Sequence, residues 1–492
     1  MSIIDWFRRG IKKVSGAIGG IKNQFYDDEY SAMYDYMQLW NAYYQNMVSN
    51  LLQYAANEEV YKNSTVTYPA MYRVCNKIAT LVFSELPRFS FDEKSQERMD
   101  YIIDKNRLLE ILRLGQTEVC GLGNVYIKIN TDKTKDYPII ELVRALDAAP
   151  AYVDWGKITE ATFYTLKRKE DNVYWWLAQT HTEIEGRKVI ESKLYKGDSV
   201  NLGNEMPLDA IEETAEIEPV ADLKTEASWF VHLKSPMPNN KDPYSCFGIS
   251  VAANSLEQID HINLTMQSYF KDDKLKQPKV AVSEDLVTPK RRGDKTKPVI
   301  DYDDEYYIML NSTSGDQIYK SIDLPSKQAD FEASIQGKLD RFYESCGLFR
   351  SALQKSGAKT ATEWELADKD STDTGADFKN SWLCVLDELF HALLEIDNAH
   401  YQGADVTSKT KHDLNQNITI EFMDSVKYDQ QEKAATATSM YNAGMISLFT
   451  SLHEIFPDWD DERVRQEIDR KNAEAASKAK VTEVDFFGSG KE

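Results

Sequence analysis

Five cysteines and seven histidines are the side chains of this sequence that could ligate zinc or do redox chemistry. The cysteines lie far apart, and no two have the C-x-x-C spacing that zinc and redox sites need. No two histidines lie four residues apart, and none clusters with a cysteine. We interpret the histidines as structural or surface residues and the cysteines as reduced, mostly buried thiols, so the sequence predicts no metal site and no cofactor. The residues are Cys75, Cys120, Cys246, Cys346 and Cys384, and His181, His232, His261, His391, His400, His412 and His453.

Three aspartates have the spacing of a partial calcium-binding loop. They are Asp368, Asp370 and Asp373, but Asp373 stands where such a loop needs glycine. Lys379 stands where the bidentate glutamate should be. The sequence therefore does not predict calcium binding here.

The segment Gly121-Leu122-Gly123 resembles the start of a dinucleotide-binding fingerprint. The residue three positions further on is Tyr126 instead of glycine, and the segment leads into a strand pattern instead of opening a helix. We interpret it as a tight turn. The P-loop, the zinc-protease helix and the nucleophile elbow also do not occur, so the sequence predicts no catalytic residue.

The charge of the chain is strongly acidic. Its 80 acidic residues outnumber 58 basic ones, which gives a net charge of -22 and a field that repels nucleic acid unless basic residues gather in patches. Carboxylates brought together by folding could still act as acid and base. A metal-dependent nucleic-acid-processing enzyme therefore remains an alternative.

The first 14 residues form an amphipathic pattern, with apolar side chains at helical spacing opposite basic ones. We favour a helix docked on its own protein. The alternative is a helix on a membrane surface, as in a membrane-peripheral scaffold. No stretch approaches the roughly 18 apolar residues of a membrane span. The apolar residues are Ile3, Ile4, Phe7, Ile11 and Val14, and the basic ones are Arg8, Arg9, Lys12 and Lys13.

The elements that position these residues follow from apolar periodicity. Residues 25–115 have mostly helical spacing, and Met71 to Phe83 predict a buried helix. From Asn124 to Lys234 the period changes to two, which predicts one twisted antiparallel sheet of about six strands. With 492 residues, the chain should form about three or four units.

Two long helices are predicted further along the chain, from Ser250 to Phe270 and from Ser326 to Cys346. Short strands and a basic turn lie between them, and Gly347 ends the second helix. A helix whose apolar face exceeds what its own chain covers must pack against another copy, as in a closed ring. The residues that we expect at contacts between copies are Leu256, Ile259, Met266, Ile335, Leu339 and Phe342.

A linker from Gly347 to Lys359 precedes a helix-start signal. Its tetrapeptide Thr-Ala-Thr-Glu contains Thr360, Thr362 and Glu363 and fits a capping box, in which Thr360 and Glu363 bond to each other's backbone. A third helix is expected to begin there. We expect it to be interrupted at Asp368 to Gly375 and to continue to Ala399, followed by one strand (NITIEF) and a helical tail.

This order of elements resembles the portal proteins of tailed bacteriophages, especially the type found in long non-contractile-tailed phages of Gram-positive hosts. Four stretches carry the resemblance, which covers nearly the whole chain: the N-terminal MSIIDWFRRG, the helix start FGISVAANSLEQIDHIN, the linker ending in TATE, and the tail AGMISLFTSLHEIFPDWDDERVRQEI.

The resemblance implies an α+β, portal-type fold. Residues 1–249 would form a wing of helices and antiparallel sheet, and residues 363–428 a long channel-facing helix that completes it. Residues 250–270 and 326–346 would be the two stem helices, and residues 271–325 the small β-containing clip. Residues 347–362 would be the channel loop and residues 429–492 the helical crown.

The resemblance also implies a function and partners. The protein would form a ring, usually of twelve copies, at one capsid vertex of the virion, after synthesis in the host cytoplasm. The terminase motor would pump double-stranded DNA through it, and the genome would later leave into the tail. Its other partners would be the terminase large subunit, head-tail adaptors and the major capsid or scaffold protein, with no membrane. The protein itself would not be an enzyme, and a capsid-associated scaffold is the alternative.

Two groups of basic residues are candidates for contacts in such a ring. Arg350, Lys355 and Lys359 could steer DNA at the channel loop, or simply solvate a linker. The clip segment could dock an acidic partner, namely terminase or an adaptor, or could be a solvated turn. Its basic residues are Lys290, Arg291, Arg292, Lys295 and Lys297.

Overall fold

The computed structural model describes residues 30–47, 67–132, 134–184, 187–198, 202–276, 279–283, 306–309, 319–322, 327–348, 361–401, 411–422, 437–441, 443–456, 459 and 462–471. The chain divides into a first unit, residues 1–423, and a second unit, residues 424–492. None of the described helices contains an apolar stretch long enough to span a membrane.

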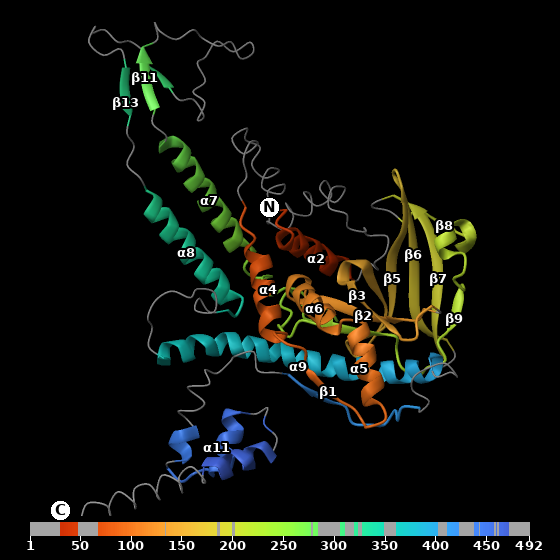
Figure 1. Ribbon diagram of the computed structural model, residues 1–492. Coiled ribbons are helices and arrows are strands. Elements are labelled where there is room, and N and C mark those ends of the chain that lie inside the picture. The colour runs from red at the N-terminus through yellow and green to blue at the C-terminus, as the bar shows by residue number, and fades with distance from the viewer. Residues whose placement is uncertain are drawn as a thin grey trace, which may run out of the picture. The chain divides into compact units, whose positions relative to one another are not determined.

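Four helices open the described part of the first unit (Figure 1). Helix α4 lies where the sequence predicts a buried helix, and its side chains Val74, Cys75 and Ile78 are completely buried. Its apolar residues recur every three or four positions, so they share one face that packs into the core. The helices are α2 (Ser31–Tyr44), α4 (Ala70–Val82), α5 (Gln96–Lys105) and α6 (Leu108–Leu122).

The strands form two main sheets, whereas the sequence predicts one. A three-stranded sheet has the order β10-β2-β3, and a six-stranded sheet has the order β4-β5-β6-β7-β8 with β9 beside β7. All pairings in both sheets are antiparallel. The strands are β2 (Asn124–Asn130), β3 (Ile139–Arg144), β4 (Ala148–Asp154), β5 (Lys157–Glu170), β6 (Val173–Ile184), β7 (Arg187–Gly197), β8 (Asn204–Met206), β9 (Val220–Asp222) and β10 (Phe230–Lys234).

The prediction of one sheet is wrong because chain order does not give strand order. Strand β2 has β3 on one edge and β10, about 100 residues later, on the other, so neither edge is left for β5. The two sheets instead contact each other through side chains. The ring of Tyr126 on β2 lies 5.6 Å from that of Phe163 on β5, and Phe163 lies 5.3 Å from Phe230 on β10.

Two antiparallel helices, α7 (Leu256–Lys276) and α8 (Gln328–Ser345), pack against each other and are called the helix hairpin below (Figure 1). Both predicted helices are therefore present, although α7 begins six residues later than expected because residues 250–255 form turns. Between them in the chain lie β11 (Lys279–Ser283), β12 (Tyr306–Met309) and β13 (Tyr319–Ile322). These strands form a small sheet in which β11 is parallel to β12 and antiparallel to β13.

Helix α9 runs without a break over Ala361–His400. The expected interruption at Asp368 to Gly375 is therefore wrong. Glycine and aspartate are weak helix formers, but each costs only about 1 kcal/mol or less. The burial of Phe378 and Trp382 just beyond them offsets that cost. The continuous helix also excludes a calcium-binding loop at the three aspartates.

The last strand of the first unit is β14 (Thr419–Glu421), which lies within the predicted NITIEF strand. It pairs antiparallel with β1 (Arg88–Ser90), with Phe89 opposite Ile420. In the second unit, α11 (Leu448–Ile455) begins after Ser447, whose side-chain oxygen accepts a hydrogen bond from the backbone N–H of Thr450. Residues 462–471 are also helical, as the tail pattern predicts.

Candidate functional site

The helix hairpin carries all six residues that the sequence places at contacts between copies. Ile259, Leu339 and Phe342 are 2%, 7% and 0% exposed. Leu256, Met266 and Ile335 are partly buried and pack on the same core. Their apolar surface is covered mainly by their own chain, and the three buried side chains have little surface left for a neighbour. Sequence periodicity identifies an apolar stripe but does not show which surface covers it.

The base of the hairpin is tied to the first helices by polar contacts. The Tyr43 hydroxyl donates to the Asp260 carboxylate at 2.9 Å, and the Tyr68 backbone N–H donates to the Asn263 side-chain oxygen at 2.9 Å. Burial raises the pKa of Asp260 to about 6, although the hydrogen bond from Tyr43 opposes this rise. These contacts fix the direction in which α7 leaves the rest of the first unit.

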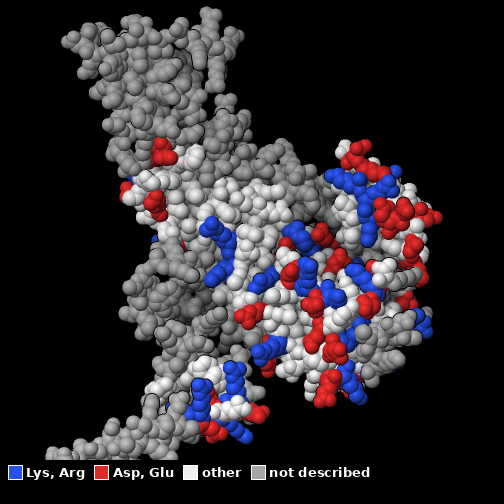
Figure 2. Space-filling model, viewed as in Figure 1, with Lys and Arg blue, Asp and Glu red and all other residues white. Residues whose placement is uncertain are grey.

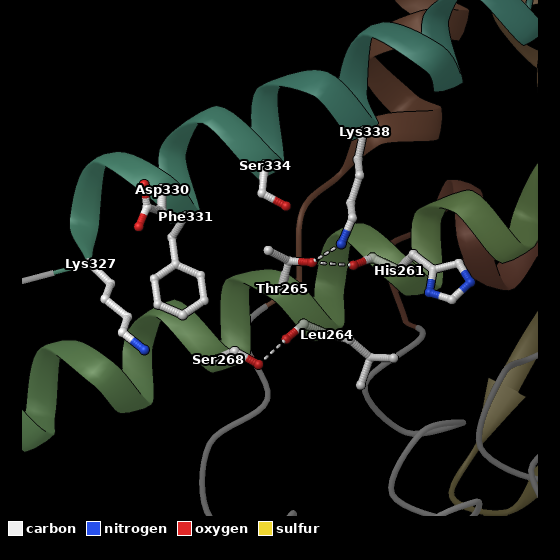
Figure 3. Close-up of a pocket in the computed structure, with 9 residues that line it drawn as sticks. All are labelled: His261, Leu264, Thr265, Ser268, Lys327, Asp330, Phe331, Ser334 and Lys338. Atoms are coloured by element: carbon white, nitrogen blue, oxygen red, sulfur yellow. Dashed lines mark hydrogen bonds between the residues drawn. The ribbon is translucent and has the colours of Figure 1, made fainter.

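An open groove of about 390 Å³ lies between α7 and α8 (Figure 3). Leu264 from α7 lines it and is 41% exposed, and Phe331 from α8 lines the other side. The Lys338 ammonium donates to the Thr265 hydroxyl, which donates to the His261 carbonyl at 2.8 Å. The groove is thus lined mostly by polar and charged side chains around the apolar Leu264 and Phe331, between two helices that are hydrogen-bonded to each other. Its lining residues are His261, Leu264, Thr265, Ser268, Lys327, Asp330, Phe331, Ser334 and Lys338.

The end of α8 is fixed to α9. Gly347 follows α8 with a positive φ of 75°, as expected for a residue that ends a helix. Its carbonyl accepts a hydrogen bond of 2.8 Å from the Thr374 hydroxyl. Further along α9, the Trp382 indole N–H donates to the Gln116 side chain at 2.6 Å. Helix α9 therefore links α8 to α6.

All eight predicted basic contact residues, and one helix-start residue, lie outside the described part of the chain. These are Arg350, Lys355, Lys359 and the helix-start residue Thr360 at the channel loop, and Lys290, Arg291, Arg292, Lys295 and Lys297 in the clip segment. Helix α9 begins at Ala361, directly after Thr360. Thr362 and Glu363 belong to α9. The structure does not describe their side chains, so the capping box stays a prediction.

A buried polar network that the sequence does not reveal joins α5, α9 and the segment before β14. The Asp397 carboxylate accepts from Arg98 at 2.7 Å and lies 3.0 Å from His412 Nε2, while His412 Nδ1 lies 2.9 Å from the Ser95 hydroxyl. Burial disfavours the charged carboxylate, but the hydrogen bonds from His412 and Arg98 outweigh it and hold the Asp397 pKa below its usual value.

The order serine, histidine, aspartate in this network is that of a hydrolase triad. Ser95, Asp397 and His412 are 0%, 1% and 5% exposed, so a substrate cannot reach the Ser95 hydroxyl. Arg98 also neutralises the aspartate. The network is therefore a structural tie between residues about 300 positions apart in the chain.

Burial also lowers the pKa of His181 and of His232 to about 3, so both imidazoles are neutral at physiological pH. Within the described ranges, no group of three or more histidine, cysteine or acidic side chains is placed to hold a metal ion.

Figure 2 shows acidic and basic side chains interspersed over the visible face of the first unit, with acidic ones gathered near β8 and β9. Among the described residues on that face, the basic side chains form no continuous stripe for nucleic acid.

The described part of the chain combines helices with mostly antiparallel sheets. The sequence matches the profile of a family described as phage portal protein, SPP1 Gp6-like, over residues 23–480. The chain belongs to this phage portal protein family. As a portal protein it is a component of the virion and of the channel for the genome at one capsid vertex. The predicted family and the α+β fold class are confirmed.

Among the solved structures that match the chain are chains of gene transfer agent particles. A chain in the virion of the native particle is 11% identical, with 84% of this chain and 91% of that chain covered and a TM-score of 0.39. A chain in the neck of the native particle, computed with C12 symmetry, is 10% identical, with 90% and 97% covered and a TM-score of 0.37. These scores are low, so the family assignment rests on the sequence profile. No curated protein sequence matches the chain significantly.

Proposed function

We propose that copies of this chain close into a ring, of twelve subunits as is usual in the family, with the helix hairpins side by side as its stem. The observation that carries this proposal is the hairpin itself: two paired helices flank a small three-stranded sheet in a chain of the portal family. A ring of identical subunits joins one surface of each copy to a different surface of the next. The hairpin offers two such surfaces, one on each side.

We expect purified protein to form rings with a central hole and about a dozen spokes in negative-stain electron microscopy. Ring closure depends on concentration, so the sample is examined over a series of concentrations together with its mass from light scattering. A protein that remains monomeric at the highest concentration contradicts the ring. With magnesium or manganese, rings alone are expected to hydrolyse neither ATP nor DNA, because the family is structural and terminase supplies the motor.

Residues 271–325 between the hairpin helices are proposed to form the clip, which docks terminase during packaging and head-tail adaptors afterwards. The basic residues Lys290, Arg291, Arg292, Lys295 and Lys297 on an acidic chain suit an acidic partner surface. Residues 347–362 are proposed to face the channel, with Arg350, Lys355 and Lys359 steering double-stranded DNA. Contact with the capsid or scaffold protein is assigned to the outer parts of the first unit.

Reversing two charges, in the variant Arg291→Glu with Arg292→Glu, is expected to leave ring formation unchanged and to weaken binding of terminase or an adaptor at least about tenfold. The physical reason is that like charges repel across a complementary interface. Pull-down of the partner by purified rings measures the effect. The matched control reverses the charges of Arg187 and Lys188, two neighbouring basic residues on β7, by replacing both with glutamate. Packaging and binding equal to those of the parent protein contradict the docking assignment.

A further inference from the structure

The two-residue turn between β4 and β5 presents a tryptophan to solvent. Trp155 is 99% exposed, and Tyr152 near the end of β4 is 58% exposed. Single exposed apolar residues are normal on protein surfaces, but here two large aromatic side chains lie three residues apart on one β-hairpin. An indole with this exposure adds almost nothing to the core, so the stability of the fold does not account for it.

The backbone at Trp155 is also unfavourable for a tryptophan. Trp155 and Gly156 both have positive φ, 47° and 77°, which is the combination that a type I′ turn requires. Asparagine, aspartate and glycine are preferred in such turns, because in the left-handed region a Cβ atom lies too close to the following carbonyl oxygen. Residues held in such conformations cluster at functional sites. The structure therefore indicates that Trp155 serves to bind a partner.

The β-hairpin holds this turn in a fixed place. Asp154 pairs with Lys157 at the end of the β4–β5 ladder, and the Lys157 ammonium donates to the Glu388 carboxylate on α9 at 2.7 Å. The next residue, Ile158, is 3% exposed and belongs to the core. A side chain on a preorganised element loses little conformational freedom on binding, and tryptophan is enriched among the residues that dominate binding energy.

The charges beside the two aromatic side chains are mainly acidic. Asp154 comes directly before the exposed tryptophan, and Glu160 lies opposite Tyr152 in the β4–β5 ladder. Lys157 is the basic residue next to the turn, and its charge is offset by its partner on α9. Two carboxylates repel DNA and anionic lipid. This acidic rim, Asp154 and Glu160, therefore suits a protein surface that has an apolar pocket with basic residues around it.

Helix α9 keeps the turn away from the helix hairpin. Thr374 on α9 contacts Gly347 at the end of α8, whereas Glu388 on α9 contacts Lys157 beside the turn. Along the continuous helix these two contacts are about 21 Å apart at 1.5 Å per residue. Figure 1 shows the six-stranded sheet on the side of the first unit away from α7 and α8. With the helix hairpins at the stem of the ring, the sheet lies further out from the ring axis.

We propose that Trp155 and Tyr152 anchor the ring to the protein shell around it, by entering an apolar pocket with a basic rim on the capsid or scaffold protein. This inference rests on the proposed ring and names the residues of its outer contact. Because every copy carries the same turn, the shell meets one anchor per subunit, and several weak contacts made together bind more tightly than any one of them.

The substitution Trp155→Asn tests the anchor, because asparagine suits a type I′ turn and lacks the indole. Purified rings are titrated against the capsid protein and, separately, the scaffold protein of the same phage, and co-sedimentation measures binding. We expect the variant to melt at the parent temperature or above it, and its affinity for one of the two shell proteins to fall about tenfold or more.

The control is Tyr244→Asn. Tyr244 is also 99% exposed but lies in the loop between β10 and α7, so this variant should bind the shell protein like the parent. A second pair of variants tests the acidic rim. Asp154→Lys with Glu160→Lys should weaken the same binding, whereas Asp209→Lys with Glu212→Lys, which changes the net charge equally at two other exposed residues, should not.

Electron microscopy of each variant separates the outcomes. Equal affinity of parent and Trp155→Asn rings overturns the anchor and leaves the ring intact, as do parent rings that bind neither shell protein. An equal loss with Tyr244→Asn also overturns it, because exposed aromatic surface in general would then be responsible. If Trp155→Asn prevents ring closure and Tyr244→Asn does not, the tryptophan joins copies to each other and the shell contact is wrong. No rings from the unsubstituted protein overturn both the ring and the anchor.

Discussion

An Asp397→Ala variant is expected to lose about 3–5 kcal/mol of unfolding free energy, because it leaves the buried Arg98 guanidinium without its counter-charge. Arg98 and Asp397 are 3% and 1% exposed, and their atoms approach to 2.7 Å. His412 would lose its Asp397 partner as well. The measurement is urea unfolding of the full chain, followed by tryptophan fluorescence at neutral pH.

The control is Glu388→Ala on the same helix. Glu388 also accepts a hydrogen bond of 2.7 Å from a basic side chain, that of Lys157, but both partners are largely exposed. Solvent-exposed pairs contribute less than about 1 kcal/mol, so this variant should unfold almost like the parent. Equal losses of unfolding free energy in the two variants would show that burial does not determine the effect.

The stabilisation by Asp397 should also depend on pH. The pKa of Asp397 is depressed in the folded state, so its contribution to the unfolding free energy is present above the usual aspartate pKa of 3.8. That contribution is lost as the pH falls through the lower, folded-state pKa.

A Gly123→Ala variant is expected to lose about 2–5 kcal/mol of unfolding free energy. Gly123 ends α6 with φ +82°, and an added Cβ would lie 2.6–2.7 Å from backbone atoms of Gly248 and Ile249. The left-handed conformation costs a residue with a side chain about 1–2 kcal/mol, and the crowded backbone adds about 1–3 kcal/mol. The same urea titration measures the loss.

Gly156 supplies the matched control for this substitution. It also has a positive φ, +77°, but an added Cβ would meet nothing within 4 Å. Gly156→Ala therefore keeps the conformational cost of about 1–2 kcal/mol and lacks the steric one. If the two variants lose the same free energy, the close approach of Gly123 to residues 248 and 249 does not contribute.

The sequence predicts local features of this fold well. The spacing of Val74 and Ile78 predicts α4, and the step from Gly123 into a period of two predicts the turn between α6 and β2. Both signals depend on neighbours in the chain. The break expected in α9 is wrong because the packing of Trp382 decides that helix, and local propensity does not reveal packing.

Features that join distant segments could not be predicted. The pairing of β10 with β2 and the contact of Arg98 with Asp397 bring together residues about 100 and 300 positions apart, and neither leaves a local pattern. The buried stripe residues Ile259 and Phe342 illustrate the same limit, because periodicity does not distinguish a partner helix of the same chain from one of another copy.

The pairing of β1 with β14 has a consequence for synthesis. Thr419 on β14 is made about 330 residues after Ser90 on β1, its partner. At roughly 5–20 residues per second, the ribosome needs about 15–65 s to supply it. Until then one edge of β1 and the apolar side chains around Phe89 lack their cover. Each nascent subunit therefore exposes this strand edge and these apolar side chains during that interval, and unpaired strand edges favour aggregation.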